Sequence, residues 1–208
     1  MKRRDALRLI AGAAVLPVLS HDVLALGREL QQHLGTSRAL KTLDPHQDAT
    51  IAAIAEMIIP ATETPGARGA RVDEFIDLVL TDWFDDEQRA RFLHGIAATD
   101  ARSRSLYGND FVKCSQPQQV ALLTALDEEL AELREAEESG RRPKKTGAFK
   151  DAEETPVEQN FFHTMRFLTL IGYYTSEVGI TQELGRPGIH MGPYQPCVPV
   201  DDNSKVQS

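Results

Sequence analysis

The feature that most constrains this fold is an apolar stretch near the C-terminus with the length of one helix. Thr155-Pro156-Val157-Glu158 combines a capping-box pattern with a proline at the first helical position, which predicts a helix from Pro156 to about Tyr174. A helix that is apolar nearly all round is buried centrally or between two neighbours. The rest of the chain must therefore cover it. Its apolar residues are Phe161, Phe162, Met165, Phe167, Leu168, Leu170 and Ile171.

Four further helices are predicted before it, each from apolar residues at helical spacing and a recognisable boundary. Asp44 and Pro45 suit the N-cap and first position of the earliest one, and Pro60 ends it. Gly108 suits the C-terminal end of the third helix. Ser115 begins a capping box for the fourth. The predicted ranges are 45–59, 72–83, 85–106 and 116–133.

The sequence as a whole predicts one helical domain with further segments before, within and after it. No stretch shows convincing strand alternation, and no internal repeat is present. We therefore expect an all-α fold, a single helical domain of about five helices with a long irregular C-terminal tail. Dense charge of both signs marks residues 134–154 as a solvated excursion. The expected segments are a signal segment at 1–25, a lead-in at 26–43, the helical domain at 44–197 and a disordered tail at 198–208.

The N-terminal segment reads MKRRDALRLIAGAAVLPVLSHDVLA and has the layout of an export signal. Its apolar run, Leu9–Leu19, is too short to span ~30 Å of hydrocarbon, which takes a helix of about 20 residues. Arg3 and Arg4 are adjacent, as in a twin-arginine signal. Lys2 and Ala6 replace the residues usual beside that pair. Export to the periplasm is predicted, and the alternative is an amphipathic N-terminal helix.

The overall composition narrows the classes of function. A chain of 208 residues suits one domain, and its 41% hydrophobic and 26% charged residues are those of a soluble globular protein. The net charge of −8 argues against nucleic-acid binding, which usually depends on a basic patch. Two cysteines are too few for a disulfide scaffold or a four-cysteine metal site.

The sequence contains little catalytic machinery. It has no glycine-rich dinucleotide or phosphate loop, no haem-attachment motif, no cysteine cluster for iron–sulfur and no nucleophile elbow. Glu177 is the most suggestive carboxylate, because it follows the apolar helix beside Tyr173 and Tyr174. It serves either as an acid or base in an aromatic pocket or as a hydrogen-bond acceptor that fixes the turn, and we favour the second. His190 has no acid or hydroxyl partner at diagnostic spacing.

The two cysteines, Cys114 and Cys197, allow more than one arrangement in an oxidising compartment. A disulfide between them would close a loop of about eighty residues, worth on the order of 4 kcal/mol in the chain-entropy model. In the other arrangement Cys114 is a small buried apolar residue, and Cys197 is cross-linked to a partner or packed at an interface. Both arrangements stay open.

Several blocks of the sequence carry a family likeness. A first helix ending in Ile58-Ile59-Pro60 is followed by T-E-T-P-G-A and by a V-x-x-F-I-D helix at Val72–Asp77. The block G-Y-Y-T-S-E-V-G occupies Gly172–Gly179, and Pro187-Gly188 and Tyr194 come after it. With the twin-arginine-type start, these blocks resemble the gluconate 2-dehydrogenase subunit 3 family, over most of the chain that follows the signal segment.

The resemblance implies a small accessory subunit of a membrane-associated periplasmic sugar or polyol dehydrogenase. In such complexes a large subunit of the glucose–methanol–choline oxidoreductase type holds FAD, and a cytochrome c subunit with several haems often takes electrons toward quinone. The small subunit is expected to bind no redox cofactor, to carry the export signal and to be needed for maturation or secretion of the flavin subunit. The motifs of the sequence agree with this role, since an export signal is predicted and cofactor motifs are absent.

The expected mechanism is binding of the large subunit through the C-terminal block, with no catalytic residue in this chain. Tyrosine buries a large area at low rotamer cost and keeps a polar tip for a hydrogen bond. Proline and glycine reduce the freedom lost on binding or permit close backbone approach. The residues expected at this interface or supporting it are Tyr173, Tyr174, Glu177, Pro187, Gly188 and Tyr194.

Two alternative functions stay open. One is a self-sufficient periplasmic enzyme that acts on sugars through Glu177 and His190. The other is a membrane-tethered structural protein whose N-terminal segment is retained as an anchor. The first alternative predicts activity of the isolated chain with a sugar and an electron acceptor, and the second predicts an exported protein that keeps its first 25 residues.

Overall fold

A computed structural model describes residues 27–29, 31, 34, 40–140 and 155–183 of the chain. This part contains helices and no strand, so the prediction of an all-α domain with about five long helices is confirmed. The predicted C-terminal tail lies almost wholly outside the described residues. The elements are α3 (Pro45–Ile58), α4 (Val72–Asp82), α5 (Asp86–Tyr107), the 3₁₀ turn η2 (Phe111–Lys113), α6 (Gln116–Gly140), α7 (Phe161–Thr175) and the π-helical turn η3 (Gly179–Glu183).

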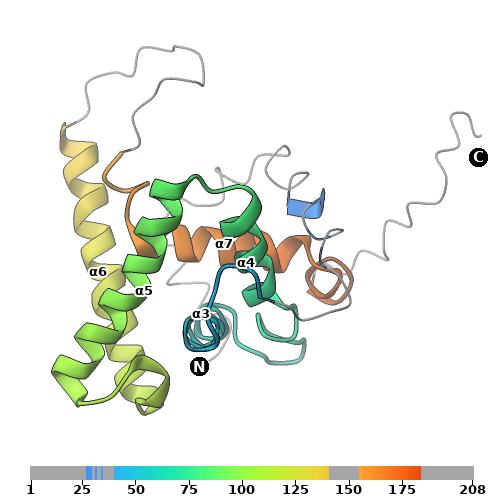
Figure 1. The fold of residues 1–208 in the computed structure, drawn as a ribbon, viewed down its shortest axis with the longest axis horizontal. Helices are drawn as coiled ribbons and strands as arrows, with labels where there is room; N and C mark the ends of the chain where they lie inside the picture. Colours follow the sequence, from blue (N-terminus) through green and yellow to red (C-terminus); the bar gives the residue numbers. More distant parts are fainter. Residues whose placement is uncertain (1–26, 30, 32–33, 35–39, 141–154, 184–208) are drawn as a thin grey trace, which may run out of the picture.

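Helix α7 is the centre of the domain. It packs against α3, α4, α5, α6 and η3, and it crosses the middle of the molecule in Figure 1. Ten of its fifteen residues are buried. Each fully buried large apolar side chain contributes about 2 kcal/mol by leaving water. The expectation that the helix with apolar residues nearly all round would be buried centrally is confirmed.

The start of α7 differs from its prediction. The capping box of Thr155 and Glu158 does form: the Thr155 N–H donates to the Glu158 carboxylate (2.8 Å), and the Glu158 N–H donates to the Thr155 hydroxyl (3.3 Å). The capping box closes only a single turn. The Val157 N–H donates to Glu137 of α6 (2.9 Å), and this contact binds the segment to α6. Asn160 then caps a new helix by accepting from the N–H of residue 163 (3.0 Å). The helix therefore begins at Phe161, and not at Pro156.

Helix α6 extends further than its apolar stripe predicted. It continues to Gly140, so the first part of the predicted excursion 134–154 is helical. Glutamate, alanine and arginine in this part are good helix formers, which explains the extension. Residues 141–154 lie outside the described part of the chain. In that described part, no helix combines the length and apolar character needed to cross a membrane.

The four predicted helix boundaries at Asp44, Pro60, Gly108 and Ser115 agree with the structure. Asp44 caps α3 by accepting from two backbone N–H groups, and Pro60 follows the C-cap of that helix. Gly108 ends α5 in the left-handed region, with φ of 74°, where glycine carries no penalty. The Ser115 N–H donates to the Gln118 side chain (2.9 Å) at the start of α6.

Helix α4 carries an aspartate that fixes the end of the lead-in. Asp77 is buried, and its carboxylate accepts from the backbone N–H groups of Lys41 (2.8 Å), Thr42 (3.0 Å) and Leu43 (2.8 Å). The Leu43 side chain is buried in the core as a result. Hydrogen bonds to charged groups are about twice as strong as neutral ones. A neutral acceptor could therefore not hold these three backbone N–H groups as strongly as the Asp77 carboxylate does.

Replacing this carboxylate should destabilise the fold. For Asp77→Ala we expect the free energy of unfolding to fall by about 3 kcal/mol, since three backbone donors lose their acceptor. Asp82→Ala is the matched control on the same helix: that side chain is 47% exposed and pairs only loosely with Lys41 (3.6 Å), so the change should be about 0.5 kcal/mol or less. Urea unfolding measures both, and equal losses would contradict the anchoring role.

Candidate functional site

The two most distinctive sequence blocks lie against each other in the fold. T-E-T-P-G-A is part of the loop between α3 and α4, and G-Y-Y-T-S-E-V-G spans the end of α7. The Tyr173 hydroxyl donates to the Pro65 carbonyl (2.9 Å). The Thr64 hydroxyl donates to the Glu183 carboxylate (3.0 Å). We call the resulting surface, formed by residues 61–71 and 172–183, the motif junction.

Glu56 of α3 shapes the loop side of the junction. Its carboxylate accepts from the backbone N–H groups of Ala61 (2.8 Å) and Arg68 (2.9 Å), so both ends of the loop are bound to one side chain. Gly66 lies inside this bend. A methyl group at Gly66 would lie 2.4 Å from the Ala61 nitrogen and 2.5 Å from a Glu56 carboxylate oxygen. The loop therefore requires glycine here for space.

Arg71 closes the loop in an unusual backbone conformation. It has φ of 55° and ψ of 40°, the left-handed region that residues other than glycine rarely adopt. Its guanidinium pairs with Glu74 in the first turn of α4, through Nε at 2.9 Å. The hydrogen bond that the Arg71 guanidinium donates to Glu74 is the main cause that raises the pKa of Arg71 above its ordinary value. This ion pair holds the strained residue at the start of α4.

The C-terminal side of the junction is a tight turn. The Ser176 hydroxyl donates to the Tyr173 carbonyl (2.6 Å) and accepts from the Gly179 N–H (3.1 Å). The rings of Tyr173 and Tyr174 meet edge to face, with centroids 5.3 Å apart. Glu177 is exposed, and its backbone carbonyl accepts from the Thr181 hydroxyl (2.7 Å). The turn therefore directs the Glu177 side chain toward solvent.

A cavity of about 210 Å³ opens between the starts of α5 and α7, away from the junction. Its lining surface is mostly apolar, with Phe84, Phe92, Phe161 and Phe167 among the lining residues, and His163 is part of it. Burial is the main cause that holds the pKa of His163 below its ordinary value. Burial therefore favours the neutral form of the imidazole, and the mostly apolar lining suits an apolar group.

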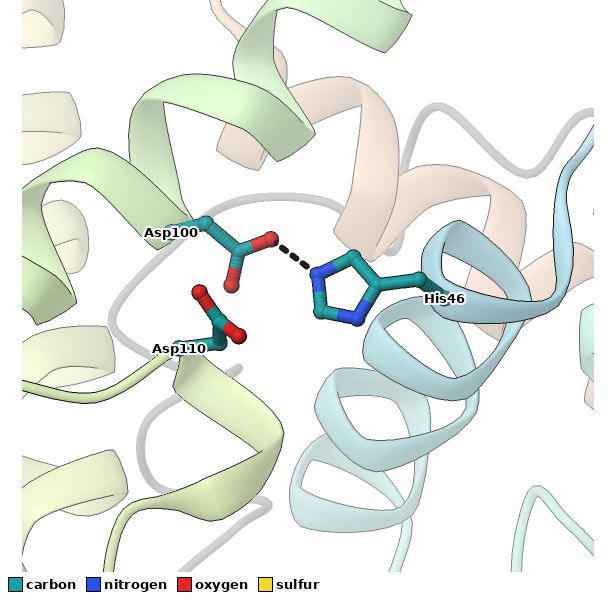
Figure 2. A group of neighbouring side chains, drawn as sticks. All are labelled: His46, Asp100 and Asp110. Atoms are coloured by element: carbon teal, nitrogen blue, oxygen red, sulfur yellow. Dashed lines mark hydrogen bonds and ion pairs between the residues drawn. The ribbon is translucent and has the colours of Figure 1, made fainter.

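One group of described side chains has the spacing of metal ligands. His46, Asp100 and Asp110 each offer a ligand atom, and these atoms lie within 4.8 Å of one another (Figure 2). Arg104 and then Lys113 hold the pKa of Asp110 below its ordinary value by hydrogen bonding to its carboxylate. No short spacing links these three residues in the sequence, so no sequence pattern indicates the group.

The family model of gluconate 2-dehydrogenase subunit 3 matches residues 45–189. The chain belongs to this family. Neither a curated protein nor a solved structure matches it. The match covers both blocks of the motif junction. Membership in the subunit 3 family makes the chain an accessory subunit of a multi-subunit dehydrogenase complex of the gluconate 2-dehydrogenase type.

The predicted interface residues of this subunit 3 chain divide into three groups. Tyr173 is fully buried, so it supports the junction from inside and does not present its ring on the surface. Tyr174 is half-buried and Glu177 is exposed, so both lie where a partner can reach them. The remaining ones lie outside the described residues, together with the predicted signal arginines and the alternative catalytic histidine: Pro187, Gly188, Tyr194, Arg3, Arg4 and His190.

Cys114 occupies a buried position beside α5. Its thiol lies 3.0 Å from the Ser103 hydroxyl, which is itself fully buried, and 3.8 Å from the Asn109 carbonyl. These contacts fit the arrangement in which Cys114 packs as a small interior residue. Cys197 lies outside the described residues, so the disulfide between the two stays a prediction.

The shape of the subunit 3 loop should depend on Gly66. Gly66→Ala should lower the free energy of unfolding by about 2 kcal/mol, because the added methyl group pushes Glu56 off the backbone donors that it binds. Gly140→Ala is the control, since among the described residues no atom beyond the neighbouring backbone of its own helix lies within 4 Å of the added methyl group there. It should change the free energy by about 0.5 kcal/mol or less in the same urea titration. Equal stability of the two variants would show that the loop accommodates a side chain.

Proposed function

We propose that this chain is the non-catalytic small subunit that binds, matures and escorts a large FAD-containing sugar or polyol dehydrogenase subunit of the glucose–methanol–choline type. FAD belongs to that partner, and in such complexes a cytochrome c subunit often takes the electrons. The complex works at the periplasmic face of the membrane. Family membership supports the accessory role, and the twin-arginine-type pair Arg3 and Arg4 supports the export route.

The observation that carries the proposal is how the motif junction uses its polar groups. Glu56 and the Tyr173 hydroxyl bind backbone atoms of the loop, and Glu183 binds a loop side chain. The distinctive residues therefore build one fixed surface from two segments that are far apart in the sequence. A surface that is rigid before binding loses little conformational entropy on binding, which suits a docking site.

The composition of the junction surface also fits a docking site. Glu63, Arg68, Glu177 and Gln182 are exposed on it, and Tyr174, from the same two segments, is half-buried. Interfaces commonly place an aromatic residue within a polar rim. We expect Tyr174 to act as the anchor, with the charged groups selecting the orientation of the flavoprotein.

Selective binding to the folded form of the partner is enough to explain maturation. A subunit that binds the native flavoprotein and not its unfolded form stabilises the native form by mass action. The twin-arginine route transports folded cargo, so one signal on the small subunit serves both chains. The FAD subunit thus folds around its cofactor in the cytoplasm and crosses the membrane bound to this chain.

The escort role is tested by changing the signal. When the chain is co-expressed with its proposed flavoprotein partner, Arg3→Lys combined with Arg4→Lys should leave the flavoprotein and its activity in the cytoplasmic fraction. Fractionation followed by a dye-linked sugar oxidation assay measures both. A flavoprotein that still reaches the periplasm in full amount would refute the escort role.

The docking site is tested separately by reversing one exposed charge. Glu177→Lys should weaken co-purification of the flavoprotein at least about tenfold, because the interface carries an unmatched charge. Glu132→Lys makes the same change on the exposed side of α6, at the opposite end of the molecule in Figure 1, and should leave binding intact. Circular dichroism checks that both variants are folded. Equal binding by both would place the interface elsewhere.

A further inference from the structure

A histidine and two aspartates from three elements meet on the side of the domain where α3 begins. His46 belongs to the first turn of α3, Asp100 to α5, and Asp110 to the segment just before η2. Figure 2 shows the imidazole directed at the Asp100 carboxylate, with the Asp110 carboxylate beside it. The His46 Nε2 and Asp100 Oδ2 atoms are 2.6 Å apart. This group plays no part in the motif junction.

Asp100 is fixed in place by the fold. It is only 4% exposed, and its Oδ1 atom accepts from the Phe111 N–H at 2.9 Å. The other oxygen, Oδ2, is left to face His46. A buried carboxylate with one oxygen held by the backbone and the other directed into a polar group has the arrangement of an oriented metal ligand.

Asp110 is held more loosely. Its two oxygens accept from Arg104 (2.6 Å) and Lys113 (3.0 Å), whose side chains are 54% and 67% exposed. Exposed ion pairs of this kind contribute little free energy, so both cations can turn toward solvent when a stronger cation arrives. Two carboxylates and an imidazole within 4.8 Å then remain to surround it.

We propose that His46 Nε2, Asp100 Oδ2 and one oxygen of Asp110 bind a divalent transition-metal ion of the zinc class. Imidazole combined with carboxylates suits such ions, whereas magnesium and calcium prefer oxygen ligands alone. The His46 side chain is 43% exposed, so water completes the coordination from the solvent side. Coordination requires an Nε2 atom without a proton. The imidazole then carries its proton on Nδ1, and a proton on Nε2 is released to solvent.

The bound ion would join three parts of the domain. It would connect the start of α3 to α5 and to the segment that leads into η2, in addition to the His46–Asp100 contact, the Phe111 N–H and the Arg104–Asp110 pair that already join these parts. Because these residues come together only in the native state, the metal stabilises the fold by mass action. The site is independent of the proposed docking role, and its ligands lie away from residues 61–71 and 172–183.

Titration of the full chain, without added tag histidines and after EDTA treatment and dialysis, tests the site. Isothermal titration with ZnCl₂ should give one tight site per chain, and the melting temperature should rise with zinc concentration. His46→Ala and Asp110→Asn should each weaken binding at least about 100-fold, since each removes one of three ligands. His94→Ala removes an exposed histidine from α5 and should bind zinc like the unchanged chain.

Cobalt gives a direct view of the ligands. Co²⁺ should produce visible absorption bands of a low-symmetry site in the unchanged chain and in His94→Ala, and these bands should be lost in His46→Ala. Asp100→Asn is avoided as the main variant, because that residue also satisfies the Phe111 N–H and its loss affects folding. Zinc affinity that is unchanged in both His46→Ala and Asp110→Asn, or no binding at millimolar zinc, would overturn the proposal.

Discussion

Burial of α7 is the constraint on which the rest of the structure depends. A helix with large apolar side chains on most of its surface is stable in water only when neighbours cover it, and here α3, α4, α5 and α6 all do so. The covering helices in turn fix the loops between them. The segment after α3 must bend back to reach α4, and it is this bend that brings Pro65 to the Tyr173 hydroxyl.

The same constraint explains a polar residue within α7. Arg166 is 4% exposed, and burial is the main cause that lowers its pKa from the ordinary value. Its guanidinium pairs with Asp127 of α6 and lies over the Phe162 ring, 5.7 Å from the centroid. A buried cation needs such partners because removal from water is costly. This ion pair therefore fixes how α6 sits on α7, in addition to the apolar contacts.

The motif junction shows why a sequence block that is distinctive of a family need not contain catalytic residues. In the sequence, tyrosines, serine and glutamate crowd the end of α7 and draw attention to chemistry. In the fold, Tyr173 and Ser176 bind backbone atoms, and Glu183 accepts from Thr64. These residues maintain a shape. Glu177 alone among the carboxylates of this turn is directed outward, which is why a binding role at the surface fits it better than acid–base chemistry in a pocket.

Helical periodicity and end signals are local and act within a few residues, so the sequence alone predicted the five long helices of the described residues and the boundaries at Asp44, Pro60, Gly108 and Ser115. Its motif blocks predicted the family. It misplaced the start of α7, since the choice between Pro156 and Asn160 depends on the contact of Val157 with Glu137. The meeting of the α3–α4 loop with the end of α7, and the convergence of His46 with Asp100 and Asp110, depend on the tertiary packing. Pro65 is 108 positions from Tyr173 and His46 is 54 positions from Asp100, and no local pattern records the packing angles that bring such residues together.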